Sequence, residues 1–288
     1  MQLEELISQT REQVEMALHA CCGSDKWADR MLNCVPFTSV QDLINKATTN
    51  WYEACDEKDW LEAFTHHPKI GDRKSLEEKF AATKHLAGAE QAGVADATTA
   101  VIERLEAANK AYEDKFGFIF IVCATGKSAA EMLRLLEDRL QNTYPEEITI
   151  AMGEQHKITI IRLKKLLADT DWSWMKISQL TTHVLDTSLG KPGKDITIKL
   201  KGQQAGDWRT IAQGVTNSDG RIADLLPPQR FVEPGIYKMV FQTAAYFQEQ
   251  QVTGFYPEVE IQFTVFDQSH YHVPLLINPF GFSTYRGS

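Results

Sequence analysis

The chain has 288 residues, of which 43% are hydrophobic and 24% are charged, and its formal net charge is −9. This composition is ordinary for a globular protein of one or two domains, so it excludes a disordered, collagen-like or mainly coiled-coil chain. The negative charge argues against a general nucleic-acid binder, which needs a basic face, and the longest apolar stretch, 116–124, is far too short to cross a bilayer.

The first residues, MQLEELISQTREQVEM, are acidic where a secretory signal peptide is basic and then apolar. The last three residues do not form a peroxisomal import signal. We therefore expect a cytoplasmic protein, with peroxisomal import through an unrecognised signal as the alternative. The five cysteines all precede residue 124 and lack the spacing of a zinc site, so we expect reduced thiols.

The first part of the chain has helical periodicity. Apolar residues recur at helical spacing from Leu3 to Leu18, and Ser39 and Ser75 are each followed three residues later by an acid, as at helix starts. The stretches 128–140 and 145–166 predict two more helices. The stretch 116–122 has the composition of a strand, but within a helical domain we favour a buried extended segment.

The second part is richer in glycine and proline, and it alternates apolar with polar residues as strands do. The clearest strands are 196–200 and 259–265, while 243–252 predicts one short helix. Regularly spaced turn signals between the strands favour a β-sandwich. We therefore expect two domains, an all-α helical bundle at 1–170 and an all-β sandwich at 178–288, joined by a linker at 171–177.

Candidate chemistry in the first part begins at His67, which precedes Pro68. The proline disfavours helix at the preceding residue, so His67 should project from the point where a helix ends. From these residues alone, His67 could be a capping or core histidine, a catalytic group or, with His66, a metal ligand. Arg162 lies among isoleucine and leucine, where it could extend to solvent or bind an anion.

Four motifs in this part occur in order and strongly resemble the OHCU decarboxylase family over about residues 5–168. They are His67-Pro68-x-Ile70-Gly71, Glu90-Gln91, the stretch 116–121, and Glu154-x-x-Lys157-Ile158-x-x-x-Arg162-Leu163. That family decarboxylates 2-oxo-4-hydroxy-4-carboxy-5-ureidoimidazoline (OHCU) to (S)-allantoin. The resemblance implies an all-helical, often dimeric domain that uses no metal and no organic cofactor.

The resemblance also implies roles for individual residues. His67 would be the catalytic acid or base and Glu90 its partner, while the substrate-binding residues would be Pro68, Gln91, Ile119, Phe120, Ile121, Val122, Cys123 and Arg162. Decarboxylation leaves an electron pair that a proton must quench, and a histidine can supply it near neutral pH. A carboxylate beside the ring would favour its protonated form, and an arginine can bind a carboxylate through two hydrogen bonds.

Histidines also mark the second part of the chain. On strand alternation, His183 shares a face with Leu185, and His270 shares one with His272 and Pro274. Buried or edge histidines are one interpretation. A zinc site formed by His183, His270 and His272 is another, although no carboxylate is evident to support it.

Another set of motifs resembles 5-hydroxyisourate hydrolase, the enzyme branch of the transthyretin-like family, over about residues 178–288. The motifs are TTHVLD at 181–186, Asp219-Gly220-Arg221, HVPLL at 272–276 and the terminal YRGS at 285–288. The resemblance implies a metal-free, tetrameric sandwich with active sites between subunits. It places His183, Arg221, His272 and Tyr285 in the site, with Arg286 and Ser288 completing it.

The two activities are consecutive, because hydrolysis of 5-hydroxyisourate yields OHCU and decarboxylation of OHCU yields (S)-allantoin. The sequence therefore predicts a bifunctional enzyme of urate degradation that takes these small molecules as substrates and forms a homo-oligomer. The tetramer would form through the β-domain, with dimer contacts through the α-domain. In the alternative, only one half is catalytic, and the β-domain serves as a small-molecule binding or tetramerisation module.

Overall fold

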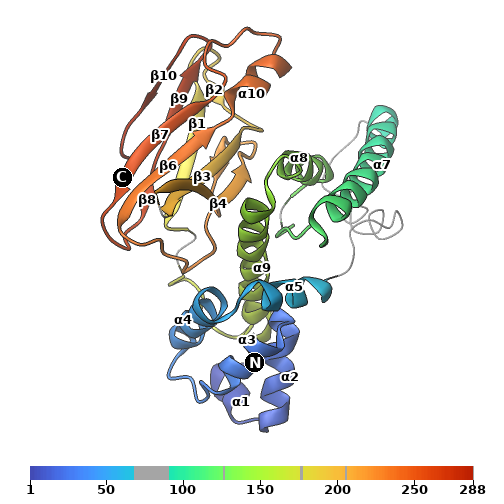
Figure 1. Ribbon diagram of the computed structural model, residues 1–288, viewed down its shortest axis with the longest axis vertical. Coiled ribbons are helices and arrows are strands. Elements are labelled where there is room, and N and C mark those ends of the chain that lie inside the picture. The colour runs from blue at the N-terminus through green and yellow to red at the C-terminus, as the bar shows by residue number, and fades with distance from the viewer. Residues whose placement is uncertain (68–90, 126, 176–177, 205, 288) are drawn as a thin grey trace. The chain divides into compact units, whose positions relative to one another are not determined.

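The computed structural model describes residues 1–67, 91–125, 127–175, 178–204 and 206–287. The chain divides into two compact units, which are drawn in Figure 1. We call the first the helical unit (Ile7–Pro36 and Thr49–Arg162) and the second the sheet unit (Met1–Leu6, Phe37–Thr48 and Leu163–Ser288). The domain limits expected from the sequence, at residues 170 and 178, stay predictions.

Among the described residues up to 166, all regular structure is helical. The helices are α1 (Leu3–Ile7), α2 (Arg11–Cys22), α3 (Asp25–Leu32), α4 (Val40–Thr49), the π-helix η1 (Asn50–Ala54), α5 (Glu57–Thr65), α7 (Gln91–Phe116), α8 (Ala129–Arg139) and α9 (Tyr144–Leu166). This confirms the helices expected after Ser39, at 128–140 and at 145–166. The start expected at Ser75 lies outside the described residues.

The apolar residues from Leu3 to Leu18 lie in two helices, because the chain breaks between α1 and α2. Thr10 adopts an extended backbone and accepts a hydrogen bond from the Gln13 amide, while the Gln13 side chain accepts one from the Thr10 amide. This capping box starts a new helix at Arg11. The local hydrogen bonds therefore outweigh the continuous apolar periodicity.

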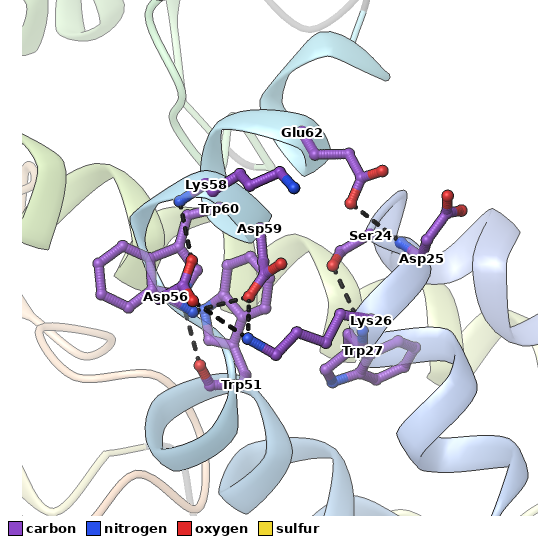
Figure 2. Close-up of polar contacts among 10 residues, drawn as sticks. All are labelled: Ser24, Asp25, Lys26, Trp27, Trp51, Asp56, Lys58, Asp59, Trp60 and Glu62. Carbon is purple, nitrogen blue, oxygen red and sulfur yellow. Dashed lines mark hydrogen bonds and ion pairs between the residues drawn. The ribbon is translucent and has the colours of Figure 1, made fainter.

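Charged and capping side chains join the start of α5 to α3, as Figure 2 shows. The Lys26 ammonium lies 3.1 Å from Asp56 and 2.7 Å from Asp59, which together form the capping box of α5. Glu62, one turn further on, accepts a hydrogen bond of 3.1 Å from the Asp25 amide. These contacts fix α5 against α3, and α5 leads directly to His67.

The segment after α7 has no regular secondary structure, yet Phe118, Phe120 and the three residues that follow are buried. This confirms the expected buried extended segment. Its backbone is held by Arg139, whose Nη1 donates to the Ile121 carbonyl at 2.8 Å. The Arg139 guanidinium also pairs with Glu147, and Tyr112 donates a hydrogen bond to the same carboxylate.

The sheet unit contains two sheets that pack face to face (Figure 1). The strands are β1 (Leu180–Asp186), β2 (Lys191–Pro192), β3 (Thr197–Gln204), β4 (Asp207–Val215), β5 (Arg221–Ile222), β6 (Gly235–Phe241), β7 (Val259–Val265), β8 (Tyr271–His272), β9 (Leu275–Asn278) and β10 (Gly281–Thr284), and the helix α10 spans Thr243–Glu249. One sheet has the order β10-β9-β1-β2, with β5 and β8 also paired to β1, and the other has the order β4-β3-β6-β7. The predicted sandwich and its short helix are confirmed.

Strand β1 shows the alternation that creates the sandwich. Leu180, Thr182 and Val184 are buried in the core, whereas Thr181 and His183 lie on the less buried face. The single strand expected around His270 to Leu276 is wrong, because β8 and β9 are separated at Val273 and Pro274. Proline has no N–H to donate to a sheet, which accounts for the interruption. No helix among the described residues is long and apolar enough to cross a membrane.

The buried Arg139–Glu147 pair gives a stability prediction. Arg139→Met leaves the Glu147 carboxylate buried without its cation, so we expect the free energy of unfolding to fall by about 3 to 5 kcal/mol. The matched control is Arg104→Met, which removes the exposed Arg104–Glu137 pair between α7 and α8 and should cost less than about 1 kcal/mol. Urea unfolding followed by circular dichroism measures both, and equal losses would contradict the prediction.

Candidate active sites

Three segments of the helical unit meet at His67. The ring Nε2 of His67, just beyond α5, lies 2.6 Å from Oε1 of Gln155 on α9. The amide nitrogen of Gln155 donates to the carbonyl of Cys22 at the end of α2. Arg162, also on α9, donates from Nη1 to the carbonyls of Ala20 and Cys21, each at 3.4 Å. The imidazole and the guanidinium are thus anchored to the same helix end.

A glycine at the end of α2 allows α5 and His67 to come close to this helix end. Gly23 ends the helix with φ of 82°, a left-handed conformation that glycine adopts without strain. A Cβ at this position would lie 2.8 Å from the Cβ of His66, so a side chain would also collide with the end of α5. The ring of His66 packs edge-on against His19 at 5.2 Å. Gly23 therefore permits the close approach that places His67 beside α9.

The surroundings of His67 lower its pKa below the usual value for histidine. Burial is the main cause, and the positive charge of Arg162 adds to it, while the hydrogen bond with Gln155 acts in the opposite direction. The described surroundings therefore favour a neutral ring at pH 7. The protonated ring expected from a neighbouring Glu90 is not tested, because Glu90 lies outside the described residues.

A second group of polar side chains on α9 holds the extended segment. Glu154 accepts a hydrogen bond of 2.7 Å from the Cys123 amide and forms an ion pair of 2.6 Å with Lys157. Both charged side chains are buried, as is Gln155. The carbonyl of Cys123 accepts a hydrogen bond from Lys127 at 3.0 Å. Both the N–H and the carbonyl of Cys123 are therefore hydrogen-bonded, which fixes the backbone that we expect to contact the substrate.

The structure brings together only part of the site predicted for the first domain. His67 and Arg162 approach the same helix end, and 119–123 is packed against α9. Pro68 and Glu90 lie outside the described residues, and Gln91 is the first residue of α7. Sequence reasoning assigned no role to Glu154, Gln155 or Lys157. Together with His156 they form a run of four polar residues between apolar residues of α9, and the structure buries all four, an arrangement that can mark a functional site.

A cavity of about 710 Å³ lies between α2 and α3 in the same unit. Its lining includes Glu12, Glu15, Asp25 and Asp29, together with His19. Four carboxylates would repel an anionic ligand. This cavity therefore does not suit a carboxylate substrate, which the guanidinium of Arg162 would favour.

The sheet unit brings three predicted residues together at the end of one sheet. His183 on β1 is the register partner of Arg221 on β5, and Thr181 is the register partner of His272 on β8. The Thr181 hydroxyl lies 2.9 Å from Nδ1 of His272 and 2.8 Å from Nε2 of His270. Strand pairing alone therefore assembles two imidazoles and a guanidinium.

These histidines also have pKa values below the usual value. For His183, burial is the main cause and the positive charge of Arg221 the second. For His272, burial comes first, followed by the charges of Arg221 and of the two neighbouring histidines. Both rings therefore favour the neutral form at pH 7, in which a ring nitrogen can accept a proton.

The end of the chain returns to this cluster. The Gly287 amide donates to the His272 carbonyl at 3.0 Å, and a Cβ at Gly287 would lie only 2.4 Å from the His272 ring. Arg286 lies over the ring of Tyr271, while the side chain of Tyr285 is 59% exposed. Ser288 lies outside the described residues. Gly287 is a residue that sequence reasoning did not assign, although it lies within the YRGS motif.

Metal binding was an open interpretation at both clusters. Within the part of the chain that the structure describes, no three His, Cys, Asp or Glu side chains are grouped closely enough to hold a metal ion. The His183–His270–His272 interpretation therefore has no geometric support in the described residues. The five cysteines are free thiols.

Comparison with known proteins assigns both parts of the chain. A sequence model for OHCU decarboxylase matches residues 8–164, and one for the HIUase/transthyretin family matches residues 180–287. The "Uric acid degradation bifunctional protein TTL" of Arabidopsis thaliana is 33% identical, with the match covering 93% of this chain and 96% of that protein. The 5-hydroxyisourate hydrolase of Mus musculus is 42% identical over 38% of this chain and 96% of its own.

A solved structure described as (S)-allantoin synthase is 25% identical and covers both chains fully, with a TM-score of 0.46, which is too low to bear on the assignment. The family models and the Arabidopsis relative suffice, because together they account for both units. The chain therefore belongs to the OHCU decarboxylase family, with a C-terminal domain of the HIUase/transthyretin family.

Proposed function

We propose that this chain degrades urate in two consecutive steps, hydrolysis of 5-hydroxyisourate to OHCU and stereoselective decarboxylation of OHCU to (S)-allantoin. The observation that carries the proposal is that each unit places a guanidinium beside an imidazole of lowered pKa, at the positions that the two family motifs mark. The bifunctional Arabidopsis relative supports the pairing of both steps on one chain.

In the helical unit, Arg162 would bind the carboxylate or ureido group of OHCU and His67 would handle the proton. Decarboxylation breaks a carbon–carbon bond, releases CO2 and leaves its electron pair on the ring of the substrate. Because the neutral form of His67 is favoured, the proton that quenches this carbon must first be taken up, from the substrate or from solvent. Delivery from one fixed ring to one face of the carbon would yield a single stereoisomer.

In the sheet unit, one of the two neutral imidazoles would accept a proton from the attacking water. The water oxygen bonds to a ring carbonyl carbon, so negative charge develops on the carbonyl oxygen. The carbon–nitrogen bond then breaks as the C=O reforms, and the nitrogen takes up the proton from the imidazole. Arg221, the register partner of His183, is placed to stabilise that charge. The second histidine would orient the water or the substrate, and Tyr285, Arg286 and Ser288 would line the same site.

We also propose that the chain forms a homo-oligomer through the sheet unit. Several large apolar side chains of this unit are exposed, more than half of the surface of each of Phe255, Phe266 and Phe280 being accessible. Tyr256 packs edge-on against both Phe255 and Phe282, so these three rings form a cluster. Such exposure of aromatic side chains is typical of surfaces that bind other proteins. The cluster at His183 is open in a single chain, as Arg221 and Tyr285 are exposed, and a neighbouring subunit would enclose it.

The proposed location is the cytoplasm. Five free thiols persist in a reducing compartment, and none is paired in a disulfide. Burial raises the pKa of Cys21 to about 11 and that of Cys55 to about 11, so these thiols stay protonated. Protonated thiols are poor nucleophiles, so the proposed reactions assign no role to Cys21 or Cys55.

His67→Asn tests the decarboxylase role in the complete chain. We expect decarboxylation to fall by about 100-fold or more, because the ring that carries the proton is lost, while hydrolysis of 5-hydroxyisourate continues. Circular dichroism of the product, corrected for the spontaneous reaction, follows the allantoin enantiomer. Near-normal formation of (S)-allantoin would refute the role of His67.

His272→Asn is the reciprocal test, and it decides between an enzyme and a binding or tetramerisation module. We expect the loss of 5-hydroxyisourate absorbance to slow by about 100-fold, while supplied OHCU is still decarboxylated. The oligomeric state, measured by light scattering, serves as the control for assembly. If hydrolysis is unchanged in His272→Asn and in His183→Asn, the sheet unit is not the hydrolase.

Arg221→Gln tests the electrostatics of the second site without relying on activity. Removing the guanidinium removes a positive charge that lowers both pKa values, so the pKa values of His183 and His272 should rise. Proton NMR titration of the two rings measures them directly. Unchanged or lower pKa values would show that Arg221 does not act on these rings.

A further inference from the structure

The orientation of the Gln155 amide is fixed by two separate contacts. Its nitrogen lies 3.1 Å from the Cys22 carbonyl, which can only accept a hydrogen bond, so the nitrogen must be the donor there. Its second contact is the Thr159 hydroxyl at 3.4 Å, and that hydroxyl donates its own hydrogen to the main-chain carbonyl of Gln155 at 3.1 Å. Both contacts require the amide nitrogen on that side and leave the amide oxygen facing His67.

This orientation determines where the proton of His67 lies. Oε1 of Gln155 can only accept, and it lies 2.6 Å from Nε2 of His67, so Nε2 must carry a hydrogen. A neutral imidazole has one N–H, which leaves Nδ1 as the nitrogen with the lone pair. Burial and the charges of Arg162 and His66 all favour the neutral form.

We propose that Gln155 is a positioning residue that holds His67 as the Nε2–H tautomer, so that Nδ1 is the ring nitrogen that exchanges a proton during decarboxylation. The proposal rests on the function proposed above and adds the atom that performs its proton transfer. A glutamine suits this task because its amide is neutral and cannot exchange the proton itself, whereas a carboxylate at the same place would favour the imidazolium.

The same helix fixes the substrate-binding cation. Gln155 and Arg162 lie seven residues apart on α9, which places them on one face, and both donate to the last carbonyls of α2. Gln155 is fully buried, so its side chain has little freedom to turn. The residue that holds the imidazole and the guanidinium are thus both bonded to one helix end, which favours the fixed geometry that a stereoselective proton delivery requires.

The first test reads the tautomer in the resting protein. The full chain is prepared with nitrogen-15 in its histidine rings, and the His67 signals are identified by their loss in His67→Asn. We expect a neutral ring with the hydrogen on Nε2 at pH 7. A hydrogen on Nδ1 would overturn the proposal, whatever the activity of the protein.

The second test removes the acceptor with Gln155→Leu. We expect the His67 tautomer to shift toward Nδ1–H and kcat for decarboxylation to fall by about 100-fold, with a smaller change in KM and unchanged hydrolysis of 5-hydroxyisourate. The matched control is Ile160→Val, which shortens a buried side chain on the same helix without removing any hydrogen bond of Gln155, and it should leave the tautomer in place. If kcat falls equally in the Gln155 variant and in the control, and the His67 tautomer is the same in both as in the unmodified protein, Gln155 has a purely structural role.

Gln155→Glu keeps the test decisive if Gln155→Leu does not fold. A glutamate still accepts from Nε2, but its negative charge should raise the pKa of His67 and move the acidic limb of the pH–rate profile to higher pH. An unmoved limb in the folded variant would overturn the role of Gln155. Full decarboxylation by His67→Asn would instead reject the function proposed for His67, while the nitrogen spectra would still decide the tautomer.

Discussion

Helix α9 buries charged and amide side chains that must find partners, and the helical unit is arranged around them. Leaving a buried charge or amide without a hydrogen bond costs several kcal/mol, which is comparable to the whole free energy of unfolding of a typical domain. Glu154 is satisfied by Lys157 and the Cys123 amide, and Gln155 by Cys22 and His67. The extended segment, the end of α2 and the end of α5 are thereby drawn to one helix.

The two units have unrelated folds, yet in both of them the pKa of a histidine is lowered by the same two causes. In each, partial burial removes water from an imidazole and a nearby guanidinium disfavours its protonation, so the pKa falls. The helical unit does this through side chains on converging helices, and the sheet unit through the register of adjacent strands. A neutral ring near a cation suits both reactions, since each must move a proton near an anionic heterocycle.

Much of the fold follows from local periodicity, which the sequence displays directly. The alternation in β1 and the helical repeats of α8 and α9 predicted these elements, and the motif residues predicted where His67 and His183 would lie. The partner of His67 could not be predicted, because Gln155 is 88 positions away and only the packing of α5 on α9 joins them. The break before Arg11 depends on the capping box at Thr10, which apolar spacing does not reveal.

The common direction of the pKa shifts matters because both reactions take place in the same medium, at one pH. A rise of the pKa in one site and a fall in the other would separate the pH ranges of the two reactions, and the intermediate would then accumulate. Here burial and a guanidinium lower the pKa in both sites, so the neutral ring is favoured at pH 7 in both. The sequence motifs determine which chemistry each site performs, whereas this shared electrostatic design allows both to operate under one condition.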